Sequence, residues 1–193
     1  MKSVLISIQP KWCELIASGK KTVEVRKTRP KLETPFKVYI YCTKGEPLIK
    51  STQGHGRCFV DGYTTEDNLY GLYELLNGKV IGEFVCDTIE TLTEQDLFEG
   101  MDEISNSRIE EYSCVDIDRL LQYKGSKNEI YGWHISDLVI YDKPRELSEF
   151  KKPCTHKNDC CTCDRYDYIG HRCYDDITRP FQSWGYVESE EQK

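Results

Sequence analysis

The sequence lacks a long apolar segment, an internal repeat and any low-complexity tract apart from an acidic end at residues 188–193. A helix needs about 20 consecutive apolar residues to cross a lipid bilayer, so we expect no membrane association. The first residues also lack the apolar core and the small-residue cleavage site of a secretory signal peptide. We therefore expect a cytoplasmic protein.

The composition excludes two further classes of protein. Hydrophobic residues make up 38% of the 193 residues, which is too many for a disordered chain and enough for one compact domain with a small appendage. The net charge of −7 argues against a protein that coats nucleic acid without specificity.

Charge is divided unevenly along the chain. Residues 1–60 contain twelve Lys and Arg against four Asp and Glu, whereas residues 61–120 contain three against sixteen. A basic first third predicts a patch that faces phosphate groups, with an acidic surface elsewhere on the molecule. Mutual neutralisation of the two regions in the folded protein would explain the same pattern, so the charges alone leave both interpretations open.

Alternating apolar and polar residues predict five strands. They span residues 4–8, 22–26, 37–42, 79–89 and 131–141. In the second of these, alternation places Val23 and Val25 on one face. Glu24 and Arg26, together with Thr22, then lie on the other.

Two short helices and a closing strand complete the expected fold. Helical spacing of apolar residues predicts helices at residues 11–18 and 116–123, and residues 181–187 are typical of a strand. Residues 43–78 contain six glycines and little periodicity, which predicts a long loop or insertion. The pattern favours an α+β protein built as a small β-barrel with helical plugs.

The segment after the first predicted helix fits the pattern G-x-K-x-x-E-x-R at residues 19–26. Together with the sequence SIQPKW at residues 7–12, it resembles the ASCH domain, a branch of the PUA-like β-barrels. The resemblance is specific over residues 3–30 and extends more loosely through residues 1–147, with a divergent middle. It implies a PUA-like mixed β-barrel around a cleft, and a role in binding RNA or modified nucleotides.

The resemblance also implies that the polar residues of this motif line the cleft. Arg supplies a rigid fork of donors and Lys a mobile point charge, and the two together suit a phosphate group or a base edge. Glu24 could accept a hydrogen bond from a base amino group or hold the two cations in place. A surface ladder of opposite charges would have the same spacing. The family resemblance therefore favours nucleotide binding by Lys21, Glu24 and Arg26 over a surface ladder of charges.

Aromatic side chains give a second set of candidates. A flat ring can stack on a base, so we include Trp12 and His134 among the predicted nucleotide-binding residues. Trp133 and Trp184 lie in segments that the family places around the barrel. Tryptophans in a small barrel more often belong to the core, and a histidine with partners more often has a structural role.

An enzymatic role is an alternative. Some small ASCH proteins hydrolyse the acetyl amide of N4-acetylcytidine, using a Lys of this motif, a Thr three residues later and a distant Glu. Lys21 matches that Lys, but Glu24 stands at the Thr position and Thr22 is the only hydroxyl nearby. Other ASCH proteins are linked to RNA cleavage, for which a phosphate clamp and a general base would suffice. If the protein is an amidohydrolase or a ribonuclease, we expect Lys21 and Glu24 to be catalytic.

Five of the ten cysteines fall within twenty residues near the end of the chain. Four of them, with a CxxC pair in the middle, suit a tetrahedral Zn²⁺ ion. The predicted ligands are Cys154, Cys160, Cys163 and Cys173. Cys161 could replace Cys160, and His156 or His171 could replace a cysteine. Disulfides are the alternative, which a cytoplasmic location disfavours. All-cysteine sites leave no open position for water, so we expect a structural zinc.

These observations predict an ASCH/PUA-like β-barrel at residues 1–147, with an insertion at about residues 43–78. A cysteine-rich zinc segment with a closing strand follows at residues 148–193, and residues 179–188 resemble the ending of larger bacterial and phage members of the family. The expected partner is nucleic acid, RNA rather than DNA, or a modified nucleotide. Two alternatives stay open. One is the hydrolase, and the other is an adaptor that binds another protein through the acidic residues 90–118.

Overall fold

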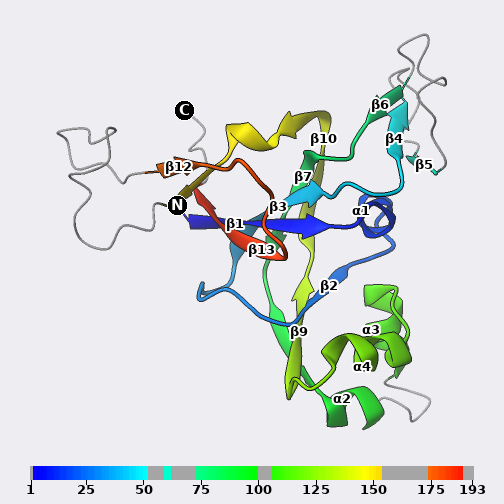
Figure 1. Ribbon diagram of the computed structural model, residues 1–193. Coiled ribbons are helices and arrows are strands. Elements are labelled where there is room, and N and C mark those ends of the chain that lie inside the picture. Colours follow the sequence, from blue (N-terminus) through cyan, green and yellow to red (C-terminus); the bar gives the residue numbers. More distant parts are fainter. Residues whose placement is uncertain (1, 52–58, 62–72, 100–105, 154–173, 189–193) are drawn as a thin grey trace, which may run out of the picture.

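The computed structural model describes residues 2–51, 59–61, 73–99, 106–153 and 174–188. Strands dominate this part of the chain and the helices are short (Figure 1), which confirms the expected mixed α+β class. No helix within these ranges is long and apolar enough to span a membrane.

The largest sheet has five strands. They are β1 (Lys2–Ile8), β3 (Phe36–Cys42), β7 (Lys79–Cys86), β10 (Ser136–Glu146) and β13 (Trp184–Glu188). Their order is β10-β7-β3-β1-β13, in which β1 and β3 are parallel and the other neighbours are antiparallel. The closing strand expected near the end of the chain is therefore present as β13, beside the first strand.

A second sheet has three strands in the order β2-β9-β8. They are β2 (Val23–Arg26), β8 (Ile89–Thr93) and β9 (Glu129–His134). Only Ile135 separates β9 from β10, and two residues separate β7 from β8. The predicted strands at residues 79–89 and 131–141 are thus each two strands, which leave one sheet and enter the other.

The described strands do not close into a barrel, which corrects the barrel expected from the sequence. β2 pairs with β9 alone, and the edge of β1 that does not face β3 pairs with β13. The two sheets therefore meet at an open seam between β1 and β2, where side chains take the place of a backbone ladder. Arg26 crosses this seam, because its Nη2 donates to the backbone oxygen of Ser7 at 2.7 Å.

Helices cover the two sheets at different places. α1 (Pro10–Ala17) agrees with the predicted first helix within one residue at each end. Pro10 fits its first turn, where a missing N–H leaves no helical bond unmade. Three further helices gather beside β2 and the start of β9 (Figure 1). They are α2 (Glu94–Glu99), α3 (Asn106–Ser113) and α4 (Ile117–Lys124), of which only α4 was expected.

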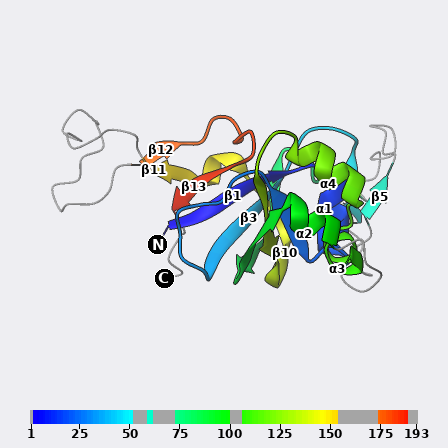
Figure 2. The ribbon, with the colours of Figure 1, turned by 90° about the horizontal axis from the view of Figure 1, so that it is seen from below.

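Several smaller elements lie outside these layers. β4 (Leu48–Ser51), β5 (Phe59–Asp61) and β6 (Tyr73–Leu75) form a three-stranded sheet. Of the two alternatives expected at residues 43–78, a long loop or an insertion, the loop is wrong, because the segment contains short strands. A 3₁₀ helix, η2 (Leu147–Glu149), precedes the pair β11 (Lys151–Pro153) and β12 (Tyr174–Asp176). Figure 2 shows β11, β12 and η2 at the end of the molecule opposite α3 and α4.

The core explains which side chains face the seam. Val23 and Val25 pack in one buried cluster with Leu97 of α2 and Leu120 of α4. The alternation within β2 then directs Glu24 and Arg26 to the opposite face, as the sequence predicted. Trp133 is fully buried in the cluster that also includes α1 and the inner residues of β1 and β3.

Gly82 tests the packing of β7 against β10. A Cβ at this position would lie 2.4 Å from the backbone oxygen of Val139, so Gly82→Ala forces the β7–β10 pair apart. We expect a loss of about 2 kcal/mol in the free energy of unfolding. Gly45→Ala is the matched control, because its Cβ would meet Pro10 at an ordinary 3.7 Å. Urea denaturation measures both, and equal stability of the two variants would contradict this packing.

Candidate nucleotide-binding cleft

A cleft of about 550 Å³ opens at the seam between β1 and β2. The end of β1, the start of α1, strand β2 and helix α4 all contribute to its lining. Among the predicted site residues, Trp12, Lys21, Glu24 and Arg26 line this cleft together. Its volume lies in the range of small-molecule sites, which is about 300–1,000 Å³.

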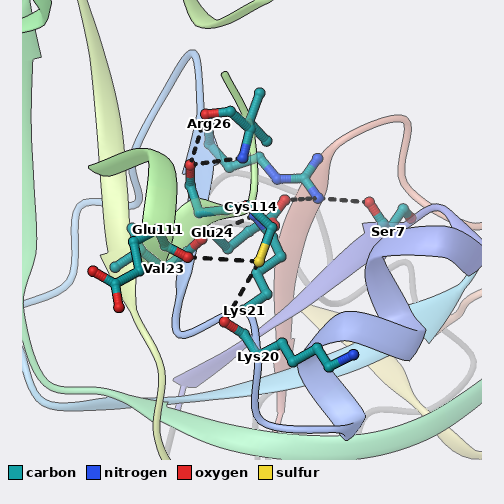
Figure 3. Close-up of polar contacts among 10 residues, drawn as sticks. Ser7, Lys20, Lys21, Val23, Glu24, Arg26, Glu111 and Cys114 are labelled. Carbon is teal, nitrogen blue, oxygen red and sulfur yellow. Dashed lines mark hydrogen bonds and ion pairs between the residues drawn. The ribbon is translucent and has the colours of Figure 1, made fainter. Parts of the chain in front are cut away.

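Glu24 lies between two cations at the bottom of the cleft. One carboxylate oxygen is 3.2 Å from Lys21 Nζ, and the other is 2.9 Å from Arg26 Nη2. All three residues are buried, with exposed fractions of 2% for Lys21, 6% for Glu24 and 9% for Arg26. Figure 3 shows Glu24 close to Lys21 and Arg26, with Arg26 extended toward Ser7. We call these three residues the charge triad.

Lys21 is held on all sides by acceptors. Besides Glu24, its ammonium group donates to the backbone oxygens of Val23 at 2.9 Å and Ser113 at 2.7 Å. Ser113 ends α3, so the ammonium also lies at the negative end of that helix. The three N–H groups of an ammonium therefore each have an acceptor. The ring of Trp12 lies beside it, with Nζ 5.2 Å from the ring centroid.

The local backbone brings Lys21 to this position. The backbone N–H groups of Lys20 and Lys21 both donate to the oxygen of Leu15, near the end of α1, so the chain turns directly from the helix into β2. The N–H of Thr22 then donates to Tyr112 in α3. Cys114 follows α3 with a φ of +54°, and its thiol donates to the oxygen of Lys20. These contacts fix the end of α3 against the motif (Figure 3).

Arg26 keeps spare donor capacity. Its Nη2 donates to the carboxylate of Glu24 and to the backbone oxygen of Ser7, whereas Nη1 lies 3.4 Å from the hydroxyl of Ser183. The buried Nε has no partner among the described atoms. Ser183 belongs to the C-terminal pattern at residues 179–188, and its backbone oxygen also accepts from the N–H of Ser7. The C-terminal segment thus completes this side of the cleft.

The rim of the cleft supplies further cations and a ring. Lys11, Arg119 and Tyr123 line the cleft and are exposed. Burial of part of its ring raises the pKa of Tyr123, which lies close to Arg26 and Glu24. The sequence reasoning missed Arg119 and Tyr123, because nothing in the pattern of α4 distinguishes a residue beside a cleft from a solvated one.

Two predicted aromatic candidates lie elsewhere. His134 does not line the cleft; it is exposed, and its Nδ1 lies 2.7 Å from the carboxylate of Asp87. The reason is its register, because His134 pairs with Val23 and not with Glu24. Trp133 pairs with Glu24 but is fully buried in the core. Of the predicted aromatic residues, Trp12 alone stands in the cleft wall.

Two thiols lie in the core near the charge triad. Burial raises the pKa of Cys13 well above its usual value, and the neighbouring Cys42 raises it further. A neutral buried thiol is a poor nucleophile, so Cys13 fits a packing role. The predicted zinc ligands Cys154, Cys160, Cys163 and Cys173 lie outside the described residues. Within the described residues, no group of three or more metal-binding side chains occurs.

The comparisons with known proteins give the family. The sequence model of the ASCH domain matches residues 6–141, which is more than half of the chain. The chain belongs to the ASCH family. ASCH domains are PUA-like and generally RNA-binding. The matched range includes all three residues of the charge triad and the walls formed by α1 and α4.

Solved structures of ASCH proteins are similar to this chain. The ASCH protein from Zymomonas mobilis is 19% identical, with a TM-score of 0.49 over 75% of this chain and 73% of that chain. A point mutant of ASCH from the same organism is 17% identical, with a TM-score of 0.48 over 76% of this chain and 77% of that chain. The search among curated proteins found no match.

Glu24→Gln tests the charge triad. Removing the carboxylate leaves two buried cations that face each other, which costs about 3–5 kcal/mol in the free energy of unfolding. Glu74→Gln is the control, because Glu74 and its partner Lys79 are both about 30% exposed and their pair contributes up to about 1 kcal/mol. Chemical denaturation measures both variants. Equal losses would contradict a tightly coupled triad.

Proposed function

We propose that the protein binds RNA or a modified nucleotide in this cleft, through Lys21, Glu24, Arg26 and Trp12. The observation that carries the proposal is the charge triad itself, at the bottom of a cleft with an aromatic wall. Buried charges are expensive to desolvate, and packed apolar residues often stabilise a protein as well or better. A ligand gives a reason for two cations and a carboxylate to be held there.

Each group offers a different contact to a nucleotide. Glu24 already accepts from both cations, yet each carboxylate oxygen has a second lone pair for a base amino group. Two cations against one carboxylate leave a positive charge at the bottom of the cleft. Lys11 and Arg119 add two more cations on the rim, where a phosphate group can remain in water. This division suits a base inside the cleft and a phosphate at its edge.

Trp12 supports recognition by stacking. Its ring is half-buried, and Lys11 Nζ lies 5.1 Å from its centroid. Lys11 is exposed, so it can move aside when a base approaches. Single-stranded nucleotides are commonly bound in this way, with a base on an aromatic ring and polar groups at its edge.

The hydrogen bonds favour binding over hydrolysis. A Lys acting as a general base must be neutral, and Lys21 would then lack a hydrogen for one of its three acceptors. Both oxygens of Glu24 pair with cations, so the carboxylate has a direct role in holding Lys21 and Arg26 in place. Thr22, the hydroxyl residue within the motif, is not among the residues that line the cleft.

The acidic residues of the helical layer also favour RNA binding over the adaptor alternative. The carboxylate of Asp116 accepts from the N–H of Arg119 at the start of α4, and Glu110 accepts from the N–H of Ile117. Asp96 accepts from the N–H of Thr93. These carboxylates therefore accept hydrogen bonds from backbone N–H groups of the domain itself, where they cap helices and a turn.

Trp12→Ala tests this proposal. Loss of one stacking ring costs about 1–3 kcal/mol of binding free energy, so we expect roughly tenfold weaker binding of a fluorescein-labelled single-stranded RNA of ten nucleotides. Trp12→Phe should retain most of the affinity, because a flat ring remains. Fluorescence anisotropy gives the dissociation constants.

His134→Ala is the matched control. It removes an exposed ring outside the cleft, so RNA binding should remain as in the wild type. A Trp12→Ala protein that binds RNA as tightly as the wild type would contradict the proposal, as would an equal loss in His134→Ala. Turnover of RNA or N4-acetylcytidine that disappears in Lys21→Met would favour the hydrolase instead.

We also propose that Cys154, Cys160, Cys163 and Cys173 hold a structural zinc ion. The described residues on either side support this, because β11 and β12 pair from Lys151–Asp176 to Pro153–Tyr174. Pro153 and Tyr174, the residues that directly precede and follow the cysteine-rich segment, are therefore paired in one short ladder. Four thiolates around one Zn²⁺ would stabilise such a short segment.

Metal analysis tests the zinc proposal. Protein purified without chelators should contain one zinc per chain, and Cys163→Ser should lower this content because one thiolate is lost. Cys114→Ser is the control, since Cys114 lies in the described domain and outside the cysteine-rich segment. Wild-type protein without zinc would contradict the proposal.

A further inference from the structure

The connection between β2 and β3 brings exposed cations close to aromatic residues next to the cleft. Residues 26–31 contain four cations and no acidic residue. In Figure 1 this blue segment runs from β2 past β9 and below β13 before it turns into β3. We call Lys27, Arg29 and Lys31, with the aromatic residues that they contact, the β2–β3 strip. The rings are Tyr123, Tyr131 and Tyr186.

The strip begins at the cleft. Lys27 Nζ lies 4.9 Å from the ring centroid of Tyr123, and Tyr123 is itself part of the cleft lining. Lys27 directly follows Arg26 of the charge triad in the sequence. A strand of nucleotides that leaves the cleft on this side would therefore meet the strip first.

The remaining contacts fix the strip to β9 and β13. The guanidinium of Arg29 lies 5.6 Å from the ring centroid of Tyr131 in β9. Trp184 Nε1 donates to the hydroxyl of Thr28 at 3.0 Å, and the backbone N–H of Lys31 donates to the hydroxyl of Tyr186 at 2.7 Å. Thr28 and Lys31 are thus held against β13, and Arg29 between them is held against β9.

The cations of the strip are available to a ligand. Lys27, Arg29 and Lys31 are all exposed, and none forms an ion pair with a carboxylate among the described residues. An isolated cation on a surface ring gains only about 0.5–1 kcal/mol from it. A phosphate group or a base can therefore displace or share these contacts.

We propose that the β2–β3 strip binds the nucleotides that flank the one in the cleft, so that the ligand is single-stranded RNA and not a free nucleotide. The inference rests on the proposed function of the cleft. Rings and guanidinium groups stack bases of any sequence, while Lys and Arg follow the phosphate backbone. Alternating cations and rings fit that pattern, whereas an acidic peptide has no groups to stack on the rings.

The test compares a ten-nucleotide single-stranded RNA with the four ribonucleoside 5′-monophosphates. Lys27, Arg29 and Lys31 are replaced together by Ala in the strip variant. RNA binding should weaken by about tenfold or more at low salt. The slope of log K against log salt concentration should become shallower by about 2, since each lost phosphate contact on a single strand accounts for about 0.7. Monophosphate binding, followed by NMR titration, should remain as in the wild type.

The matched control removes the same charge elsewhere. Lys44, Lys127 and Lys143 are exposed lysines outside the strip, and their joint replacement by Ala should leave RNA binding unchanged. The inference is overturned if the strip variant binds RNA as the wild type does, if both triple variants weaken it equally, or if oligoglutamate competes with RNA for the wild type as strongly as unlabelled RNA. In those cases an effect of Trp12→Ala still supports the cleft. Wild-type protein that binds neither RNA nor monophosphates overturns both proposals.

Discussion

One buried carboxylate, Glu24, holds together parts of the chain that no backbone ladder joins. It pairs with Lys21, which binds the last carbonyl of α3, and with Arg26, which binds the backbone oxygen of Ser7 in β1. The helical layer, β2 and the main sheet therefore meet at one group of charges. Because ionic side chains fill the seam in place of a sheet, the domain keeps a cleft where a closed barrel would have packed strands.

The local structure could be predicted from the sequence, and the closure of the sheets could not. The alternation around Val23 and Val25 gave the correct face of β2, and Pro10 and Gly19 marked the limits of α1. Barrel closure depends on which strand takes the free edge of β1. That place belongs to β13, nearly 180 residues later in the chain, and local periodicity contains no information about such pairings. The small sheet between residues 48 and 75 was missed for a related reason, since very short strands have little alternation to detect.

The motif predicted the charged part of the candidate site, and register decided the rest. Lys21, Glu24 and Arg26 have a pattern that resembles a family, whereas His134 was chosen for its ring and for the apolar neighbours on either side of it. A shift of one residue along β9 separates the face of His134 from that of Trp133, and sequence alone does not fix this register. Arg119 and Tyr123 reach the cleft because Leu120 of the same helix packs with Val23 and Val25 of β2, a tertiary contact that local periodicity does not show.

The central claim is that a nucleotide occupies the cleft beside Trp12, and the indole N–H signals of the protein test it most directly. The chain has three tryptophans, and they report on three places: Trp12 on the cleft wall, Trp133 in the core and Trp184 beneath the β2–β3 connection. During an NMR titration with ribonucleoside monophosphates, we expect a saturable shift of the Trp12 signal, identified from the Trp12→Phe spectrum, with Trp133 unchanged. A Trp12 signal that stays in place while other signals saturate would show that the nucleotide binds elsewhere.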